Sequence, residues 1–416
     1  MTMAQEAYVE HIPVHQSSIW KKGQPLLGRL DIEVTERCNN NCIHCNINRP
    51  LSDENARRRE LTASELKEIL VAAVTLGCLD VRYTGGEPLV REDFEEIYLF
   101  TRRLGMRVYL FSNATLIDDH WADLLARVPP LEPIEITLYG MTRQSYEGVS
   151  RAPGTYEAAW AGVRRLQERN VPFIVKGTIL PPNKHEREDF IEWAKSLPWM
   201  DDKPSFTTYY DLRARRDSDR RNRLIKRLRL TPAQGMKALG EDKESYKEEM
   251  REFCAKFIGP QGDKLYTCGA GIRSGTVDAK GYFQPCLATR NPEHIYNLRD
   301  GSLRDALTHF FPEMREIRAA NPEYLRRCAV CFLKGLCEQC PAKSYMEHGT
   351  PDTPVEYLCD IAHHQARRLG LLEEGEKSWE VTDWQARMQR LADNSGAALP
   401  KLNRDQGEIL NPCGLP

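Results

Sequence analysis

The chain has 416 residues, and its 58 Lys and Arg residues are balanced by 60 Asp and Glu residues, which excludes the strongly basic surface of many nucleic-acid-binding proteins. Hydrophobic residues make up 41% of the chain, enough for a large buried core, so extensive intrinsic disorder is excluded. No apolar run approaches the roughly 20 residues that cross a bilayer, and the N-terminus has no signal-peptide core. We therefore expect a cytoplasmic protein with neither a nucleic-acid nor a membrane partner.

Short β-type segments alternate with amphipathic segments between residues 28 and 235. We predict strands over residues 30–35, 80–84, 107–112, 134–138, 173–179 and 205–210. Helices are predicted between them over residues 63–77, 93–103, 119–127 and 156–169, the first opened by a capping box of Thr62 and Glu65. Six such units are too few for a closed eight-stranded barrel, so we expect α/β architecture with a partial (β/α)6 TIM barrel. In such folds the functional groups lie at the carboxyl ends of the strands.

The composition changes after this region. Nine basic residues lie between Arg213 and Arg229, which indicates either a solvated amphipathic helix at a domain junction or a docking face for an acidic peptide. Residues 250–365 hold eight cysteines with little periodicity, as expected of a small loop-rich domain held by metal. We therefore predict an N-terminal extension over 1–27, a core over 28–235, a cysteine-rich domain over 250–365 and a partly extended tail over 366–416.

Thirteen cysteines are an unusual number for such a chain. Because the count is odd and no secretion signal is present, a disulfide framework is not expected, and clustered thiols then indicate metal binding. Cys78 and Cys413 lie outside the clusters and are expected to be a small buried apolar group and a tail thiol.

The first cluster directly follows the first predicted strand. Cys38, Cys42 and Cys45 form a C-x3-C-x2-C array, which can bind three irons of a [4Fe–4S] cluster and leave the fourth iron open. A structural zinc site would need a fourth ligand nearby, and His44 lies too close between its neighbours to serve easily. The segment Gly85-Gly86-Glu87-Pro88 follows the second strand, where the glycines allow close backbone approach and the carboxylate can accept a hydrogen bond from an amine.

This combination resembles the radical S-adenosylmethionine (radical SAM) superfamily over residues 28–230. The resemblance implies that the open iron binds the amino and carboxylate groups of S-adenosylmethionine, and that one-electron cleavage yields a 5′-deoxyadenosyl radical, which abstracts hydrogen from a substrate. It also implies cofactor contacts for the residues His44, Gly85, Gly86, Glu87, Pro88, Ser112, Asn113, Thr137 and Lys176. Among them, His44 occupies a position that is usually aromatic and packs near the adenine.

The second set of cysteines has its own spacing. Cys268 is followed by Gly281 and Cys286, and a later run has the pattern C-x2-C-x5-C-x2-C before a last cysteine. This resembles the SPASM domain, although the last interval of the run is one residue shorter than in that family. The resemblance implies one auxiliary [4Fe–4S] cluster on Cys268, Cys286 and Cys340, with Cys254 or an open iron as fourth position, and a second on Cys328, Cys331, Cys337 and Cys359. Zinc ribbons are the competing explanation for the C-x2-C pairs.

Three [4Fe–4S] clusters with S-adenosylmethionine imply an oxidoreductase, and SPASM enzymes mostly act on peptides. Our leading interpretation is therefore a maturase of a ribosomally made precursor peptide, which installs a crosslink, an oxidation, an epimerisation or a backbone excision. Candidate pocket or catalytic residues are Tyr139, Tyr209, Tyr210, Asp211 and Arg213.

An external electron donor of the flavodoxin or ferredoxin type is implied as a partner. The 27 residues before the first strand are too few for the leader-binding domain of many maturases, so we expect a separate leader-binding protein or recognition through the basic stretch. The alternatives are a sulfatase-type formylglycine maturase, a small-molecule radical dehydrogenase, and a non-catalytic iron–sulfur electron carrier or zinc-binding scaffold.

Overall fold

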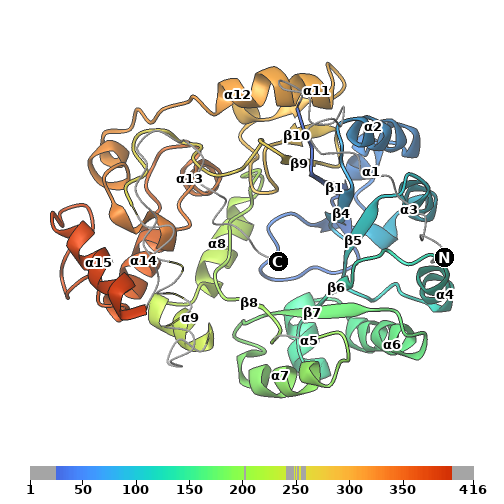
Figure 1. The fold of residues 1–416 in the computed structure, drawn as a ribbon. Coiled ribbons are helices and arrows are strands. Elements are labelled where there is room, and N and C mark those ends of the chain that lie inside the picture. The colour runs from blue at the N-terminus through green and yellow to red at the C-terminus, as the bar shows by residue number, and fades with distance from the viewer. Residues whose placement is uncertain are drawn as a thin grey trace, which may run out of the picture.

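The computed structural model describes residues 25–200, 203–239, 248, 250, 253 and 259–395. A nine-stranded sheet with the order β11-β10-β9-β1-β4-β5-β6-β7-β8 runs through it (Figure 1). Its parallel part consists of β1 (Arg29–Thr35), β4 (Asp80–Gly85), β5 (Arg107–Ser112), β6 (Ile134–Leu138), β7 (Phe173–Thr178) and β8 (Phe206–Thr207). The predicted open, partial barrel of six parallel strands is thereby confirmed.

The last of these strands is shorter than predicted, since β8 contains two residues where we expected six. The side chain of Tyr210 turns back, and its hydroxyl donates to the carbonyl oxygen of Ile179 and, at 3.2 Å, lies near that of Thr207. The residues after Thr207 therefore leave the sheet and form a wall at its carboxyl edge.

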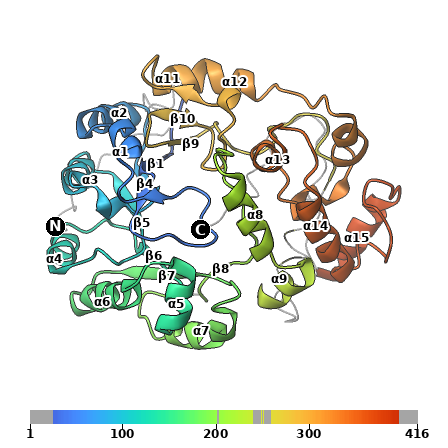
Figure 2. The same cartoon turned by 180° about the vertical axis from the view of Figure 1, so that it is seen from behind.

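Helices cover the outer face of the parallel strands (Figures 1 and 2). They are α2 (Ala63–Thr75), α3 (Phe94–Arg103), α4 (Asp119–Arg127), α5 (Arg143–Ser150), α6 (Thr155–Glu168) and α7 (Arg187–Lys195), with the short α1 (Glu54–Arg59) before them. The predicted capping box is present, because Thr62 accepts from the backbone of Glu65 and Glu65 from that of Thr62. Alternate strand residues such as Val81 and Tyr83 are fully buried, while Arg82 and Thr84 point to the other face.

The cysteine-rich region extends the same sheet. β9 (Ser274–Val277) pairs parallel to β1, and β10 (Tyr282–Gln284) and β11 (Tyr296–Asn297) continue antiparallel from it. Beyond them lie α11 (Leu303–Asp305), α12 (Phe311–Met314), α13 (Pro341–His348) and α14 (Glu356–Arg368). The helices α8 (Asp219–Leu228) and α9 (Pro232–Leu239) link the two halves of the molecule, as Figure 1 shows.

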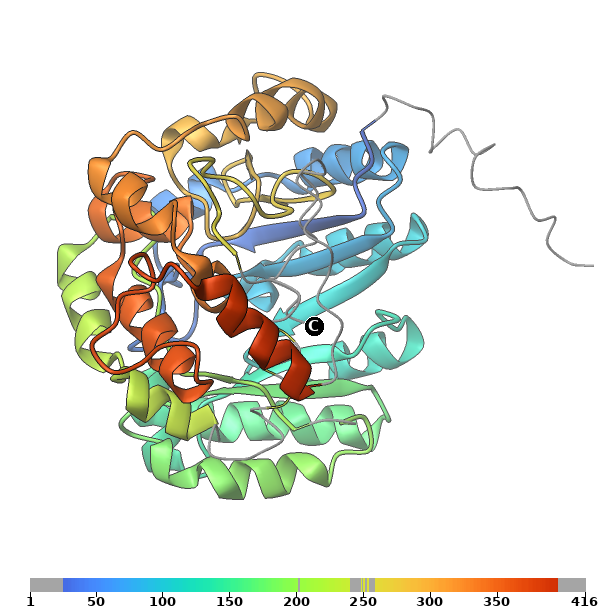
Figure 3. The same ribbon diagram turned by 60° about the vertical axis from the view of Figure 1, so that its left-hand side comes forward.

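Our expectation for the residues after 365 needs correction. The expected boundary lies inside α14, and residues 366–395 are folded, ending in α15 (Trp384–Ser395), which Figure 3 brings forward. Leu371, Met388 and Leu391 are buried together with Phe332 of the cysteine-rich region. Their apolar side chains supply a core that an extended tail would leave exposed. Within the described residues, no helix combines the length and hydropathy of a membrane span.

Candidate active site

A cavity of about 310 Å³ lies at the carboxyl ends of the parallel strands. It is lined by most of the predicted site residues, namely Cys38, Cys42, His44, Cys45, Gly85, Gly86, Glu87, Ser112, Asn113, Thr137, Tyr139, Tyr209, Tyr210 and Asp211. Thr84, Phe111 and Thr207, which we did not predict, also line it. Their positions at strand ends were the signal that could have indicated them.

The loop after β1 carries the three cysteines as free thiols. The backbone amide of Asn40 donates to Cys38 Sγ at 3.3 Å, and that of Asn48 donates to Cys45 Sγ at 3.4 Å. Burial raises the pKa of Cys42 to about 12 and that of Cys38 still further. Thiols this deeply buried become thiolates when a bound metal supplies the compensating positive charge.

Three thiols on one loop are the type of donor that an iron–sulfur cluster requires. Among the described residues, no three His, Cys, Asp or Glu side chains converge as one metal ion would require. The thiolates that bind a [4Fe–4S] cluster can lie farther apart than those that bind one metal ion, because each thiolate binds a different iron atom. The donor set of Cys38, Cys42 and Cys45 therefore fits such a cluster.

Glu87 is a buried carboxylate at the cavity wall, with 1% of its surface exposed. It accepts hydrogen bonds from the backbone of Asn113 at 2.7 Å, from Ser112 Oγ at 3.0 Å and from the backbone of Leu89 at 3.2 Å. Burial raises its pKa to about 7, and these three donors act in the opposite direction. These hydrogen bonds hold the Glu87 side chain at the cavity wall, where its carboxylate can accept a hydrogen bond from a ligand.

The glycines before Glu87 bring this segment against the cysteine loop. The backbone amides of Gly86 and Glu87 donate to the carbonyl oxygens of Thr35 and Arg37, at 2.8 and 3.0 Å. A Cβ atom at Gly86 would lie 2.0 Å from the Arg37 carbonyl oxygen, and one at Gly85, whose φ is +128°, would lie 2.1 Å from that of Thr35. Only glycine fits at these two positions.

His44 contributes an uncharged aromatic surface to the cavity. Its ring centroid lies 5.7 Å from that of Tyr139 and 5.5 Å from that of Tyr210. Burial lowers the pKa of His44 to about 4, so the imidazole is neutral at physiological pH.

Of the predicted cofactor and pocket residues, three lie outside the cavity lining. Lys176 forms an ion pair with Glu135 at 2.6 Å, deeper in the barrel, and Pro88 begins the short 3-10 helix after Glu87. Arg213 is 3% exposed and pairs with Asp217.

The basic stretch lies at the junction of the two halves, as one of its two interpretations has it, but it is neither a wholly solvated helix nor one continuous docking face. Arg215 pairs with Glu36 at 2.6 Å, and Arg221 Nη2 donates to Asn48 Oδ1 at 3.0 Å. Arg216 Nη1 donates to the carbonyl oxygens of Tyr345 and Met346, at 3.0 and 2.9 Å. Much of the stretch is therefore engaged within the protein, at the junction of its two halves.

The second set of cysteines forms two groups. Cys328, Cys331, Cys337 and Cys359 line one small cavity, together with Arg327 and Trp379. Cys268, Cys286 and Cys340 all lie close enough to Tyr266 to add to the rise of its pKa, which burial dominates. Cys254, the predicted fourth member of this group, and Cys413 lie outside the described residues.

Two residues near the first of these groups were not predicted. Ser378 Oγ lies 3.0 Å from Cys331 Sγ, and Arg327 Nη2 lies 3.7 Å from Cys359 Sγ. No sequence signal pointed to Ser378, because it belongs to the segment that we interpreted as a tail.

Residues 32–195 match the family model described as the radical SAM superfamily. Over 340 residues the chain is 26% identical to an AdoMet-dependent heme synthase of Methanosarcina barkeri, covering 76% of this chain and 92% of that protein. It is also 26% identical over 178 residues to the PqqA peptide cyclase of Gluconobacter oxydans, so that 43% of this chain matches about half, 49%, of that relative. The solved structure of native anSMEcpe with bound AdoMet and Cp18Cys peptide has the same fold, with a TM-score of 0.52 and 16% identity over 89% of this chain and 100% of that one. The matched residues 32–195 contain both the cysteine loop and the GGEP segment, and the chain therefore carries a radical SAM domain.

Proposed function

We propose that this radical SAM enzyme abstracts hydrogen from a residue of a ribosomally made precursor peptide and thereby installs a modification in it. The observation that carries the proposal is the meeting of the cysteine triad, Glu87 and the polar strand ends in one cavity. The match of the fold over 89% of the chain to a peptide-bound enzyme, and the similarity to a peptide cyclase, support a peptide as the substrate.

The radical SAM domain implies S-adenosylmethionine and a [4Fe–4S] cluster, which together supply the 5′-deoxyadenosyl radical. In our proposal Cys38, Cys42 and Cys45 hold that cluster. Glu87 accepts a hydrogen bond from the amino group of the cofactor, and the glycines before it let the backbone come close. The neutral ring of His44 lies against the adenine, where a charged imidazolium would cost desolvation energy.

The far wall of the cavity is proposed to face the substrate. Tyr139 and Tyr210 keep their hydroxyl protons at any physiological pH, because burial raises both of their pKa values well above the usual range. They therefore form an uncharged aromatic wall, and the Tyr210 hydroxyl donates to the carbonyl oxygen of Ile179. Asp211 lines the cavity, and its carboxylate lies 3.4 Å from Lys343 Nζ, so in our proposal it binds a polar group of the peptide.

The remaining cysteines are proposed to hold two auxiliary clusters, three in all, which makes the enzyme an oxidoreductase. Cys268, Cys286, Cys340 and Cys254 form one ligand set, and Cys328, Cys331, Cys337 and Cys359 the other. A flavodoxin- or ferredoxin-type donor delivers the electron. The leader of the peptide is bound by a separate protein.

A second candidate function is the modification of a small molecule. It is favoured by the similarity to a heme synthase that extends over 92% of that relative. In that case the same cavity would receive a tetrapyrrole carboxylate instead of a peptide side chain.

The test uses anaerobically reconstituted protein with S-adenosylmethionine and dithionite. We expect release of 5′-deoxyadenosine by the wild-type protein and none by a Cys42→Ala variant. Addition of short peptides encoded beside the gene should give a product of altered mass, whereas an iron porphyrin substrate should remain unchanged. Failure to release the nucleoside would refute the radical chemistry, and turnover of the porphyrin alone would refute the peptide substrate.

A further inference from the structure

The arginine-rich segment from Arg213 to Arg229 has two faces. Arg220, Arg223 and Arg227 are exposed on α8, whereas Arg213 and Arg221 turn inward to the cysteine loop (Figure 1 shows α8 between the two halves). Arg213 and Arg221 make none of the cofactor or substrate contacts proposed above.

The inward arginines meet at Asn48. Arg221 Nη2 donates to Asn48 Oδ1 at 3.0 Å and lies 3.4 Å from the carbonyl oxygen of Cys42, and Arg213 Nη1 lies 3.4 Å from the carbonyl oxygen of Asn48. Asn48 is 8% exposed, and its backbone amide donates to Cys45 Sγ at 3.4 Å. Two cations are therefore linked through one residue to a cysteine sulfur.

Asn48 also reaches the other end of the loop. Its Nδ2 donates to the carbonyl oxygen of Asn40 at 3.2 Å, and the amide of Asn40 donates to Cys38 Sγ at 3.3 Å. Through these hydrogen bonds Asn48 restrains the sulfur atoms of both Cys38 and Cys45.

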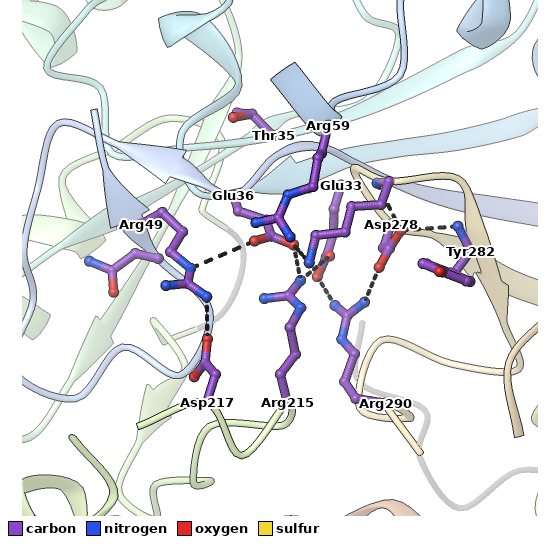
Figure 4. A network of polar contacts seen from close by, with 12 residues as sticks. Glu33, Thr35, Glu36, Arg49, Arg59, Arg215, Asp217, Asp278, Tyr282 and Arg290 are labelled. Atoms are coloured by element: carbon purple, nitrogen blue, oxygen red, sulfur yellow. Dashed lines mark hydrogen bonds and ion pairs between the residues drawn. The ribbon is translucent and has the colours of Figure 1, made fainter. Parts of the chain in front are cut away.

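The neighbouring charges of the segment are already paired. Figure 4 shows Arg215 directed at the buried carboxylates of Glu33 and Glu36, and Arg290 directed at Glu33 and Asp278. It also shows Arg49 between Glu36 and Asp217. The ion pair of Arg215 with Glu36 measures 2.6 Å, and that of Arg49 with Asp217 measures 2.7 Å. Arg215 is therefore used in joining the two halves of the protein, and Arg213 is paired with Asp217. Arg221 remains as the cation of the segment whose side chain contacts the cysteine loop.

The loop needs positive charge. Three thiolates and the nearby Glu87 carboxylate place several negative charges in a buried site, and a reduced cluster adds one more. A guanidinium keeps its charge even when buried.

We propose that Arg213 and Arg221 are positioning residues that fasten the cysteine loop through Asn48, and that Arg221 also balances the charge of its thiolates. They thereby increase both the affinity of the loop for iron and the reduction potential of the bound cluster, because cations and hydrogen bonds near cluster sulfurs favour the reduced state. The inference rests on the proposed function only in that a cluster binds to Cys38, Cys42 and Cys45.

The test compares Arg221→Gln with Arg221→Lys and with Arg223→Gln, an exposed position on the same helix. The reconstituted proteins are titrated with an iron chelator, and the midpoint potential of the cluster is measured by redox titration with electron paramagnetic resonance. For Arg221→Gln we expect roughly 10-fold to 100-fold weaker iron retention, as typical for loss of a ligand-orienting partner, together with a lower midpoint potential. Arg223→Gln should match the wild type in both.

The lysine variant separates the effect of the positive charge from that of the guanidinium geometry. Arg221→Lys keeps the positive charge but lacks the planar fork, so it should restore the potential while retaining iron less well than the wild type. The inference is overturned if Arg221→Gln has wild-type iron retention and potential, or if the lysine variant loses potential as much as the glutamine variant. Both measurements are independent of 5′-deoxyadenosine release, so an inactive wild-type protein would refute the proposed function without deciding this inference.

Discussion

Replacement of Glu87 by glutamine tests the cofactor site directly. Glu87 accepts three hydrogen bonds and is almost fully buried, so the variant changes its charge with little change in shape. Glutamine presents an amide nitrogen toward one of the three donors and offers no charge to the amino group of S-adenosylmethionine. A hydrogen bond to a charged group contributes about 1.5–3 kcal/mol, so we expect affinity for S-adenosylmethionine to fall about 10-fold to 100-fold at pH 8.

The raised pKa of Glu87, about 7, adds a pH dependence. Its carboxylate is about nine-tenths ionised at pH 8 and about one-tenth ionised at pH 6, so wild-type affinity should increase about tenfold over this range. The effect of rising pH on the free energy of unfolding has the opposite sign to its effect on affinity. Because the folded state holds this proton more tightly than the unfolded state, the contribution of Glu87 to stability is largest below its ordinary pKa of 4.5 and decreases as the pH rises toward 7.

The assay is equilibrium dialysis of labelled S-adenosylmethionine against anaerobically reconstituted protein at pH 6, 7 and 8. Titration of the cofactor's own groups affects its binding to the wild type and to Glu87→Gln equally. The difference in affinity between the two proteins therefore reports the titration of Glu87 alone. Glu92→Gln, at a side chain that is 86% exposed, is the control. An equal affinity at pH 8, or the same pH dependence in Glu87→Gln as in the wild type, would refute the assignment of this residue.

Three further outcomes are expected. Gly86→Ala forces a Cβ atom against the Arg37 carbonyl oxygen, so iron retention at the first cysteine loop should fall and stability should decrease by about 1–3 kcal/mol in a denaturant titration; unchanged values would contradict the close packing. Arg290→Gln leaves the buried Asp278 without its cation and Glu33 with only Arg215, 3.7 Å away, and should lower the free energy of unfolding by about 3–5 kcal/mol in a denaturant titration; an unchanged value would contradict the pairing. Removal of iron by a chelator should loosen residues 259–395 before residues 25–200, as measured by hydrogen exchange, and simultaneous loosening would argue against metal-dependent folding of the cysteine-rich half.

The strands and the main cavity were predictable because their signals are local. Alternating apolar residues placed the strand over 107–112 without error, and the cysteine spacing put three ligands on one short loop. Since parallel strands meet at one edge, residues such as Glu87, Asn113 and Thr137 had to lie near that loop once the strand order was known.

The tertiary structure decided which partner each charged residue meets. Lys176 forms an ion pair with Glu135 on the neighbouring strand, below the cavity, although its position at a strand end suggested a cofactor contact. The apolar residues between 366 and 395 were too sparse to predict a core by themselves, and only their packing against Phe332 makes one.

The sequence alone was enough to predict the chemistry that we propose, because a cysteine loop and a glycine-flanked carboxylate are short segments whose residue types and spacing are local. Only the folded structure decided what the basic stretch does, since Arg213 and Arg221 contact Asn48, which is more than 160 residues earlier in the chain. A run of positive charge has the same composition whether it faces water or buried acceptors. Which of the two it faces depends on contacts between distant segments, and these form only when the strands and helices pack together.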